Sequence, residues 1–480
     1  MSALSPDTAR LLSYIAAAAP VWPAVGALFI GILALPGRRP SERTIVAVSQ
    51  AVLWLAFFCV LTGAGVFLLG GEPLDIRLGH FYRAGDYGFE LLFLYDGSSV
   101  PVALLAAVLL LATSRFSVNY LHREPGFLRF FALMLTFGAG MLLLVLSGGY
   151  DLLLAGWEVV GLTSVLLVGF FHERPGPIRA SLRVLVTYRI CDIGLLLAAV
   201  WLHLSLHTTG FVEIARRLPE HRQDFPALVV GLLLLLAAMG KSAQFPVGGW
   251  LPRAMEGPTA SSAVFYGGLS VHAGVYLLIR SAPIWSQAPL CAAALVAVGI
   301  VTAVMATLSG QVSADAKTSI AYATISQVAL MLVECGLGFP RLATLHLCAH
   351  ALLRYYQFLR TPSALQDALA RRAALGLLSG AASTKRWGQL PLDLRRFLYR
   401  LAAERFEVEA ALDGWVTRPV MKLSRFLSAV ESRWAAILIG ETTGSAGVER
   451  PGGGGPSRNS EPPAAAASAP LPSATRGPSP

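Results

Sequence analysis

The segment LVVGLLLLLAAMGKSAQFPVGGW, residues 228–250, decides the fold class because it sets a lysine and a proline in otherwise apolar chain. The whole sequence is 55% hydrophobic and 14% charged, with a mean hydropathy of +0.61. These values lie far outside the range of soluble globular proteins and indicate a polytopic membrane protein. Pro246 removes a helical hydrogen bond to the Ser242 carbonyl, so we expect a broken helix beside Lys241.

Apolar runs close to the ~18–20 residues that cross a bilayer recur along the chain. They predict an all-α bundle of about eleven transmembrane helices. The first run lacks a cleavage site and is expected to be a retained helix. The runs cover residues 11–35, 46–70, 98–117, 130–149, 151–171, 184–204, 227–247, 258–280, 286–309, 319–338 and 342–361.

Basic residues in the short loops predict the orientation. The loops PGRRPSER, SRFSVNYLHREPGFLR and HERPGPIRASLR, after the first, third and fifth runs, are rich in arginine. We therefore expect a multi-pass protein of the inner (plasma) membrane with its N-terminus outside and its C-terminus cytoplasmic. The loop HLSLHTTGFVEIARRLPEHRQDF carries three arginines on the predicted outer face but also three carboxylates, so we interpret it as a structured outer segment.

Composition divides the chain into three parts: a transmembrane bundle (1–362), a basic amphipathic helical tail (363–441) and a Gly-, Pro- and Ala-rich tail (442–480) predicted to be disordered. The middle part suits an interfacial or partner-docking helix, and equally a solvated juxtamembrane segment. The five cysteines lie in apolar runs without metal-ligand spacing, and nucleotide-binding and zinc-hydrolase motifs are absent. We expect no cofactor, no metal and no nucleic-acid partner.

Ionisable residues inside the predicted spans are functional candidates, because each costs about 2.5–3.5 kcal/mol at mid-helix. A carboxylate, an ion pair at i, i+3, a lysine and a polar stripe at i, i+4, i+8 together suggest a proton relay. These residues are Glu158, the pair Arg189 and Asp192, Lys241, and the stripe His346, His350 and Arg354.

Structural roles remain open for each group: Lys241 could snorkel, Arg189 and Asp192 could form a clamp, and the histidines could be hydrogen-bonded core residues. Lysine usage favours function at residue 241. Only four of the 38 basic residues are lysines. A buried lysine can release its proton, whereas a guanidinium stays charged.

The segments GWEVVGLTSVLLVGF, GKSAQFP, WLPRAMEGPTASSA, AGVYLLIR, ADAKTSIAYATISQ and LHLCAHALLRYYQFL resemble the antiporter-like membrane subunits of respiratory complex I, most closely the L type. They are also similar to Mrp-type cation/proton antiporter subunits and to the membrane subunit of DabB-type inorganic-carbon complexes. The resemblance implies inverted five-helix repeats with helices broken near the midplane. It also implies that Glu158 and Lys241 are partners and that Asp192 with Arg189 modulates them.

The sequence departs from that family at four places. Tyr266 stands where a histidine is expected, and His272 follows six residues later. Arg354 replaces a lysine, and Glu334 is an additional carboxylate. The distal helices of the family are not recognised, and we expect the basic tail to replace them.

Three functions follow from these residues. The first is a proton-conducting membrane subunit of an NADH:quinone oxidoreductase-like or Mrp-like complex, moving protons or sodium. The second is a membrane subunit that couples proton flow to a cytosolic zinc subunit for inorganic-carbon uptake, and the third is a non-conducting structural subunit. The expected partners are other membrane subunits, a cytosolic catalytic subunit and the lipid bilayer. The chain shows no redox site of its own, so any enzymatic activity would belong to the complex.

Overall fold

A computed structural model describes residues 6–35, 37, 40–85, 87–221, 225–313, 315–374, 391–404, 406, 414 and 418–439. The predicted disordered tail 442–480, and the parts of 363–441 missing from these ranges, lie outside the described residues. The chain forms two compact units, residues 1–411 and 412–480. In the second unit the structure describes one long helix, α18 (Arg418–Ile439).

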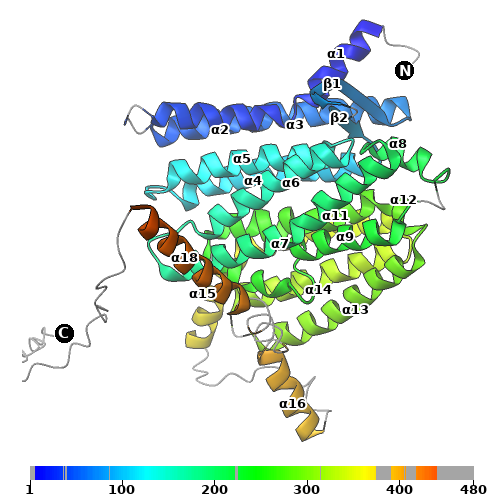
Figure 1. Ribbon diagram of the computed structural model, residues 1–480. Helices are drawn as coiled ribbons and strands as arrows, with labels where there is room; N and C mark the ends of the chain where they lie inside the picture. The colour runs from blue at the N-terminus through cyan, green and yellow to red at the C-terminus, as the bar shows by residue number, and fades with distance from the viewer. Residues whose placement is uncertain are drawn as a thin grey trace, which may run out of the picture. The chain divides into compact units, whose positions relative to one another are not determined.

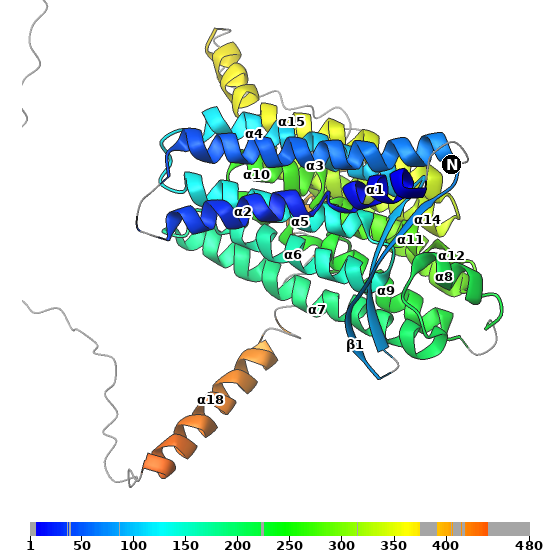
Figure 2. The ribbon, with the colours of Figure 1, turned by 90° about the horizontal axis from the view of Figure 1, so that it is seen from above.

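The first unit begins with α1 (Pro6–Ala17) and α2 (Val21–Ala34), which meet at a bend of 48°. Next comes α3 (Glu42–Gly70), whose N-cap Ser41 accepts a hydrogen bond from the Thr44 amide. Helices α2 and α3 lie alongside the following helices of the bundle in both views (Figures 1 and 2).

An antiparallel hairpin of β1 (Leu74–Ala84) and β2 (Tyr87–Tyr95) follows, which the sequence analysis did not predict. Polar and apolar residues alternate through LDIR, the period of a strand with one covered face. The buried Tyr95 donates a hydrogen bond of 2.8 Å to the Ala16 carbonyl and so anchors the hairpin to α1. The hairpin lies at the same end of the bundle as α8 (Figure 1).

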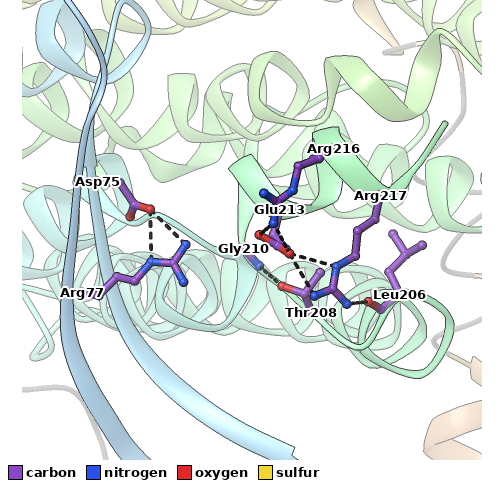
Figure 3. Close-up of polar contacts among 8 residues, drawn as sticks. All are labelled: Asp75, Arg77, Leu206, Thr208, Gly210, Glu213, Arg216 and Arg217. Atoms are coloured by element: carbon purple, nitrogen blue, oxygen red, sulfur yellow. Dashed lines mark hydrogen bonds and ion pairs between the residues drawn. The ribbon is translucent and has the colours of Figure 1, made fainter. Parts of the chain in front are cut away.

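The middle of the unit consists of α4 (Ser99–Tyr120), α5 (Phe127–Leu146), α6 (Tyr150–Val168) and α7 (Pro175–Leu206). The predicted structured segment after α7 contains the short helix α8 (Phe211–Arg217), where Arg216 and Arg217 both donate hydrogen bonds to the Glu213 carboxylate (Figure 3).

Two of the described spans are broken: the one that contains Lys241, as the sequence predicts, and the one that follows it. Helix α9 (Ala227–Lys241) ends at the lysine, five residues before Pro246, and Ala243 adopts a left-handed φ of 54°. The span Thr259–Arg280 is entirely buried and divides into α10 (Thr259–Ser261), a π-helix (Ser262–Gly268), a 3-10 turn (Ser270–His272) and α11 (Ala273–Arg280). The breaks leave backbone groups and polar side chains inside the bundle.

The last helices are α13 (Pro289–Val312), α14 (Ala316–Gly336), α15 (Pro340–Ala374) and α16 (Leu392–Ala403). Helix α15 continues past the expected end of the bundle at 362. Helix α16 contacts α13, where the Ser309 hydroxyl donates to the buried Ala402 carbonyl over 3.3 Å.

Among the described helices, eight are long and apolar enough to cross a membrane, or nine if the bent pair α1–α2 is one span. The apolar runs of the sequence predict about eleven spans. The two remaining runs correspond to α9, which has only 15 residues, and to α15, whose polar stripe lowers its apolar content.

Glycines bring the site helices close together. A Cβ at Gly194 of α7 would lie 2.3 Å from the Leu233 carbonyl oxygen, and one at Gly240 of α9 would lie 2.3 Å from Cys191 Cβ. Only glycine fits at these two positions while α7 and α9 are this close together. The two helices therefore pack with their backbones in close contact beside Lys241.

Candidate functional site

The first group of buried charges, called the lysine cluster, contains Glu158, Arg189, Asp192 and Lys241. Arg189 on α7 forms ion pairs with Glu158 on α6 and, over 2.9 Å, with Asp192 one turn away. Asp192 is only 4% exposed and also accepts a hydrogen bond of 2.5 Å from the Trp157 indole. The arginine therefore holds both carboxylates, and the indole fixes the inner one.

Lys241, the last residue of α9, is fully buried. Its ammonium donates a hydrogen bond of 3.2 Å to the Trp157 carbonyl and lies 4.2 Å from the Tyr188 ring centre and 4.7 Å from that of Trp157. Carbonyl and ring-face contacts stabilise an ammonium without an anion. Among the residues that the structure describes, no ion pair joins Lys241 to Glu158, because Arg189 occupies that carboxylate.

Gly161 lies against this ammonium. A Cβ at Gly161 would stand 2.8 Å from Lys241 Nζ and 3.8 Å from an Arg189 terminal nitrogen. Because Gly161 has no side chain, the ends of the Lys241 and Arg189 side chains have room beside it.

The outer part of the lysine cluster reaches the surface of the chain. The side chains of Arg189 and Glu158 are 47% and 37% exposed, between exposed apolar residues such as Leu162 and Ile193. An ion pair within the span of a membrane helix needs protein or water around it. This face of α6 and α7 is therefore unsuited to lipid.

The second group, called the histidine cluster, contains His272, Glu334, His346, His350 and Arg354. The expected i, i+4, i+8 stripe runs along α15, and the 3-10 turn brings His272 to it. His272 Nε2 and His350 Nδ1 share a hydrogen bond of 2.9 Å, and Arg354 Nε donates to His350 Nε2 over 3.0 Å. At the other end of the stripe, His346 Nδ1 lies 2.7 Å from the Glu334 carboxylate.

Further contacts fix Arg354 in place. It donates to the Gln357 side chain over 2.6 Å and to the Ala323 carbonyl over 3.2 Å. A Cβ at Gly267 would come within 3.2 Å of the Arg354 backbone, so the π-helix packs directly on α15. The guanidinium therefore has a fixed place beside His350.

Small polar residues connect the two clusters, and the sequence analysis did not single them out. The Ser242 hydroxyl, next to Lys241, donates over 2.8 Å to the Val271 carbonyl, next to His272. Two buried polar atoms of the broken spans, Gln244 Oε1 and Ser262 Oγ, have no hydrogen-bond partner among the described residues. Such atoms are suited to bind water.

The structure also contains a buried ion pair that sequence reasoning missed. Arg280 at the end of α11 donates over 2.6 Å to Asp96, which precedes α4. Arg280 Nε donates to Tyr276 Oη over 2.9 Å, and that hydroxyl donates to the Val145 carbonyl over 2.5 Å. Both residues lie at the ends of predicted spans, where charged residues are common. Because they are 184 positions apart in the sequence, no local pattern predicts that they pair.

Residues 150–375 match the family described as NADH:quinone oxidoreductase/Mrp antiporter, transmembrane. The chain is 34% identical over 315 residues to NADH-ubiquinone oxidoreductase chain 5 of Halichoerus grypus, covering 65% of this chain and 50% of that one. It is 33% identical over 338 residues to NADH-quinone oxidoreductase subunit L of Campylobacter jejuni, covering 70% and 54%. The chain spans about half the length of the curated relatives it matches.

Among solved structures, the Mrp complex from a Dietzia species superposes with a TM-score of 0.61 at 27% identity, covering 73% of this chain and 37% of that chain. An archaeal membrane-bound sulfane sulfur reductase superposes with the same TM-score at 19% identity, over 81% and 77%. The second similarity concerns the fold alone. The predicted antiporter-like bundle with broken helices is thus confirmed, and eight to nine of the described helices are long and apolar enough to span a membrane.

Proposed function

We infer that this chain belongs to the antiporter-like membrane subunits that include the L subunit of NADH:quinone oxidoreductase and the Mrp antiporters, and on this basis we propose that it moves protons across a membrane. The observation that carries the proposal is Lys241. A fully buried ammonium that is held by a carbonyl and two aromatic rings can lose its proton without leaving a carboxylate unpaired.

We assign the relay to the two clusters. Proton exchange would start at the lysine cluster, where Glu158 and Arg189 reach the surface, and pass from Lys241 toward His272 and His350. The Ser242–Val271 contact, which joins the two broken spans, and the buried polar atoms without partners among the described residues support this path. Water bound there would complete the hydrogen-bonded chain.

Arg354 sets the limit of this route. A guanidinium does not release a proton in a protein, and here it donates to His350 Nε2. Because His350 Nε2 accepts this bond, the neutral His350 ring carries its own proton on Nδ1, which faces His272, and it cannot take up a second proton without breaking the bond to Arg354. We assign Arg354 as a fixed charge that retains the proton on the His272 side.

We propose that the chain works as one subunit of a larger membrane complex. The relatives are named as subunits or chains of such complexes, and the exposed Glu158–Arg189 pair needs a cover. A neighbouring membrane subunit packed on α6 and α7 would supply it. The orientation with the N-terminus outside remains our proposal from the arginine-rich loops.

The segment 363–441 is proposed to dock a partner. Within it, α18 exposes apolar side chains on one face while basic residues flank that face. The exposed apolar residues with described side chains are Leu423, Phe426, Leu427 and Trp434. Deletion of 442–480 should leave assembly intact, whereas deletion from Leu365 should leave an inserted protein that no longer co-purifies with its partners.

The experiment that tests the function is reconstitution of the purified complex into liposomes that contain a pH-sensitive dye. Proton flux that responds to membrane potential, and that disappears in Lys241→Ala, is the expected result. Two other functions give different outcomes. Co-purification of a soluble zinc protein would favour coupling to inorganic-carbon uptake, and equal flux with and without the chain would favour a structural subunit.

A further inference from the structure

A small cavity lies against the break that follows α9. It has a volume of about 70 Å³ and lies between the broken segment, α13 and α14. Ala243, which forms part of its wall, follows Lys241 by two residues, and both residues are fully buried. Apolar side chains make up most of the lining, among them Phe245, Met305 and Ile325. The cavity therefore adjoins the segment of chain that carries the buried lysine.

Phe406, from the segment that follows α16, completes the wall of this cavity. The end of α16 brings it there, because the buried Ala402 carbonyl accepts the hydrogen bond from Ser309, which also lines the cavity. Ala402 is the only buried residue among those of α16, whereas Phe397 of the same helix is 60% exposed. Helix α16 is thus held to the bundle mainly at its C-terminal end.

Two residues in the wall of the cavity have a left-handed backbone. The angle φ is 54° at Ala243 and 61° at Phe406. A bulky residue adopts this conformation only where its surroundings hold it there, and such positions recur at switch regions. Leaving the cavity would allow Phe406 to return to an ordinary conformation. The contact is therefore one that can open.

We propose that Phe406 is a removable plug that keeps water away from the break beside Lys241. An apolar cavity that is closed stays dry even when it has room for several water molecules. Ser309 lies near the end of α13, and the loop after α13 follows the ninth apolar run, on the predicted cytoplasmic side. Withdrawal of Phe406 would therefore admit water from that side, as apolar gates do. The inference rests on the proposed function in one respect: water at the break would bring protons to Lys241.

The experiment measures how fast a thiol in the cavity reacts with a small, charged methanethiosulfonate reagent in the purified full-length chain. Ala306→Cys places the thiol in the cavity wall, at a position that is 5% exposed. Adding Phe406→Ala should make this thiol react about tenfold faster, because reaction of a buried thiol follows local opening. Adding Phe406→Leu, which keeps an apolar side chain in place, should change the rate little. Peptide mass mapping separates the introduced thiol from the five native cysteines.

A matched control removes a ring from the same part of the chain. Phe397→Ala lies in α16, where the ring is exposed, and it should leave the reaction of the introduced thiol unchanged. Ser309→Ala removes the hydrogen bond to the Ala402 carbonyl and should increase the rate about two- to threefold. The native Cys335 of α14 is buried and should stay unreactive in every variant.

Two results would overturn the plug. Equal rates in Phe406→Ala and Phe397→Ala would mean that the Phe406 ring does not close the cavity. A parallel increase at Cys335 would mean that the bundle as a whole loosens, without a local opening. Proton flux is not part of the readout, so either failure leaves the proposed function untouched.

Discussion

The lysine cluster and the histidine cluster each place cations inside the bundle, but they stabilise them differently. Lys241 rests on a carbonyl and two rings, at the end of a helix that stops there. Arg354 lies in the middle of α15 and is held by a histidine, a glutamine and a carbonyl. The first cation can change its charge and the second cannot. In the proposed function, the lysine cluster therefore exchanges protons and the histidine cluster confines them.

The largest effect is expected from the inner carboxylate of the lysine cluster. Asp192→Ala leaves the Trp157 indole without its acceptor and leaves Arg189 with Glu158 alone, and removing one member of a buried ion pair costs about 3–5 kcal/mol. Glu334→Ala removes a partly exposed carboxylate and should cost only about 1–2 kcal/mol. Denaturant titration in mixed micelles measures both free energies of unfolding. Equal losses would remove the distinction between the clusters.

A smaller effect on transport is expected from Gly161→Ala. The added methyl group would stand 2.8 Å from Lys241 Nζ, so the ammonium must move away from the Trp157 carbonyl. We expect a decrease in proton flux of about tenfold, equivalent to about 1.4 kcal/mol in the barrier. Gly65→Ala in α3, where a Cβ meets nothing within 4 Å, is the control. Normal flux in both variants would mean that the position of the ammonium is unimportant.

Arg354 permits a finer test. Arg354→Lys replaces the fixed charge with one that can release a proton, so passive proton leak should increase about two- to threefold, less than 1 kcal/mol in the barrier. Arg354→Ala should instead disturb packing around His350 and lower the thermal midpoint. Identical, near-normal behaviour of the two variants would make the stripe on α15 purely structural.

The smallest effect concerns the ion pairs of α8, which serve as a reference outside the membrane. Hydrogen bonds from Arg216 hold the pKa of the Glu213 carboxyl below its ordinary value of 4.5. A lowered pKa contributes stability that is complete above the ordinary value and is lost as pH falls through the lowered one. Glu213→Gln should therefore flatten the decline of the thermal midpoint below about pH 4.5 by a small amount, because Arg216 is exposed. A decline as steep as in the wild type would contradict this assignment.

The sequence predicted the membrane bundle, the break after Lys241 and the stripe on α15, because each depends on local pattern: apolar length, a proline and helical periodicity. It did not predict the hairpin, whose residues lie between two stronger apolar runs. Nor could it predict that Arg189 pairs with Glu158, since that contact depends on how α6 and α7 rotate against each other. His272 reaches His350 only because a π-helix and a 3-10 turn change the helix face before it.

Proton flux through the reconstituted complex, measured side by side in the wild type, Lys241→Arg and Arg354→Lys, tests the central claim most directly. Lys241→Arg keeps the charge but cannot release a proton, so potential-driven flux should vanish in correctly assembled complex, while Arg354→Lys keeps or increases it. Wild-type flux in Lys241→Arg would contradict the claim that the lysine releases its proton during transport.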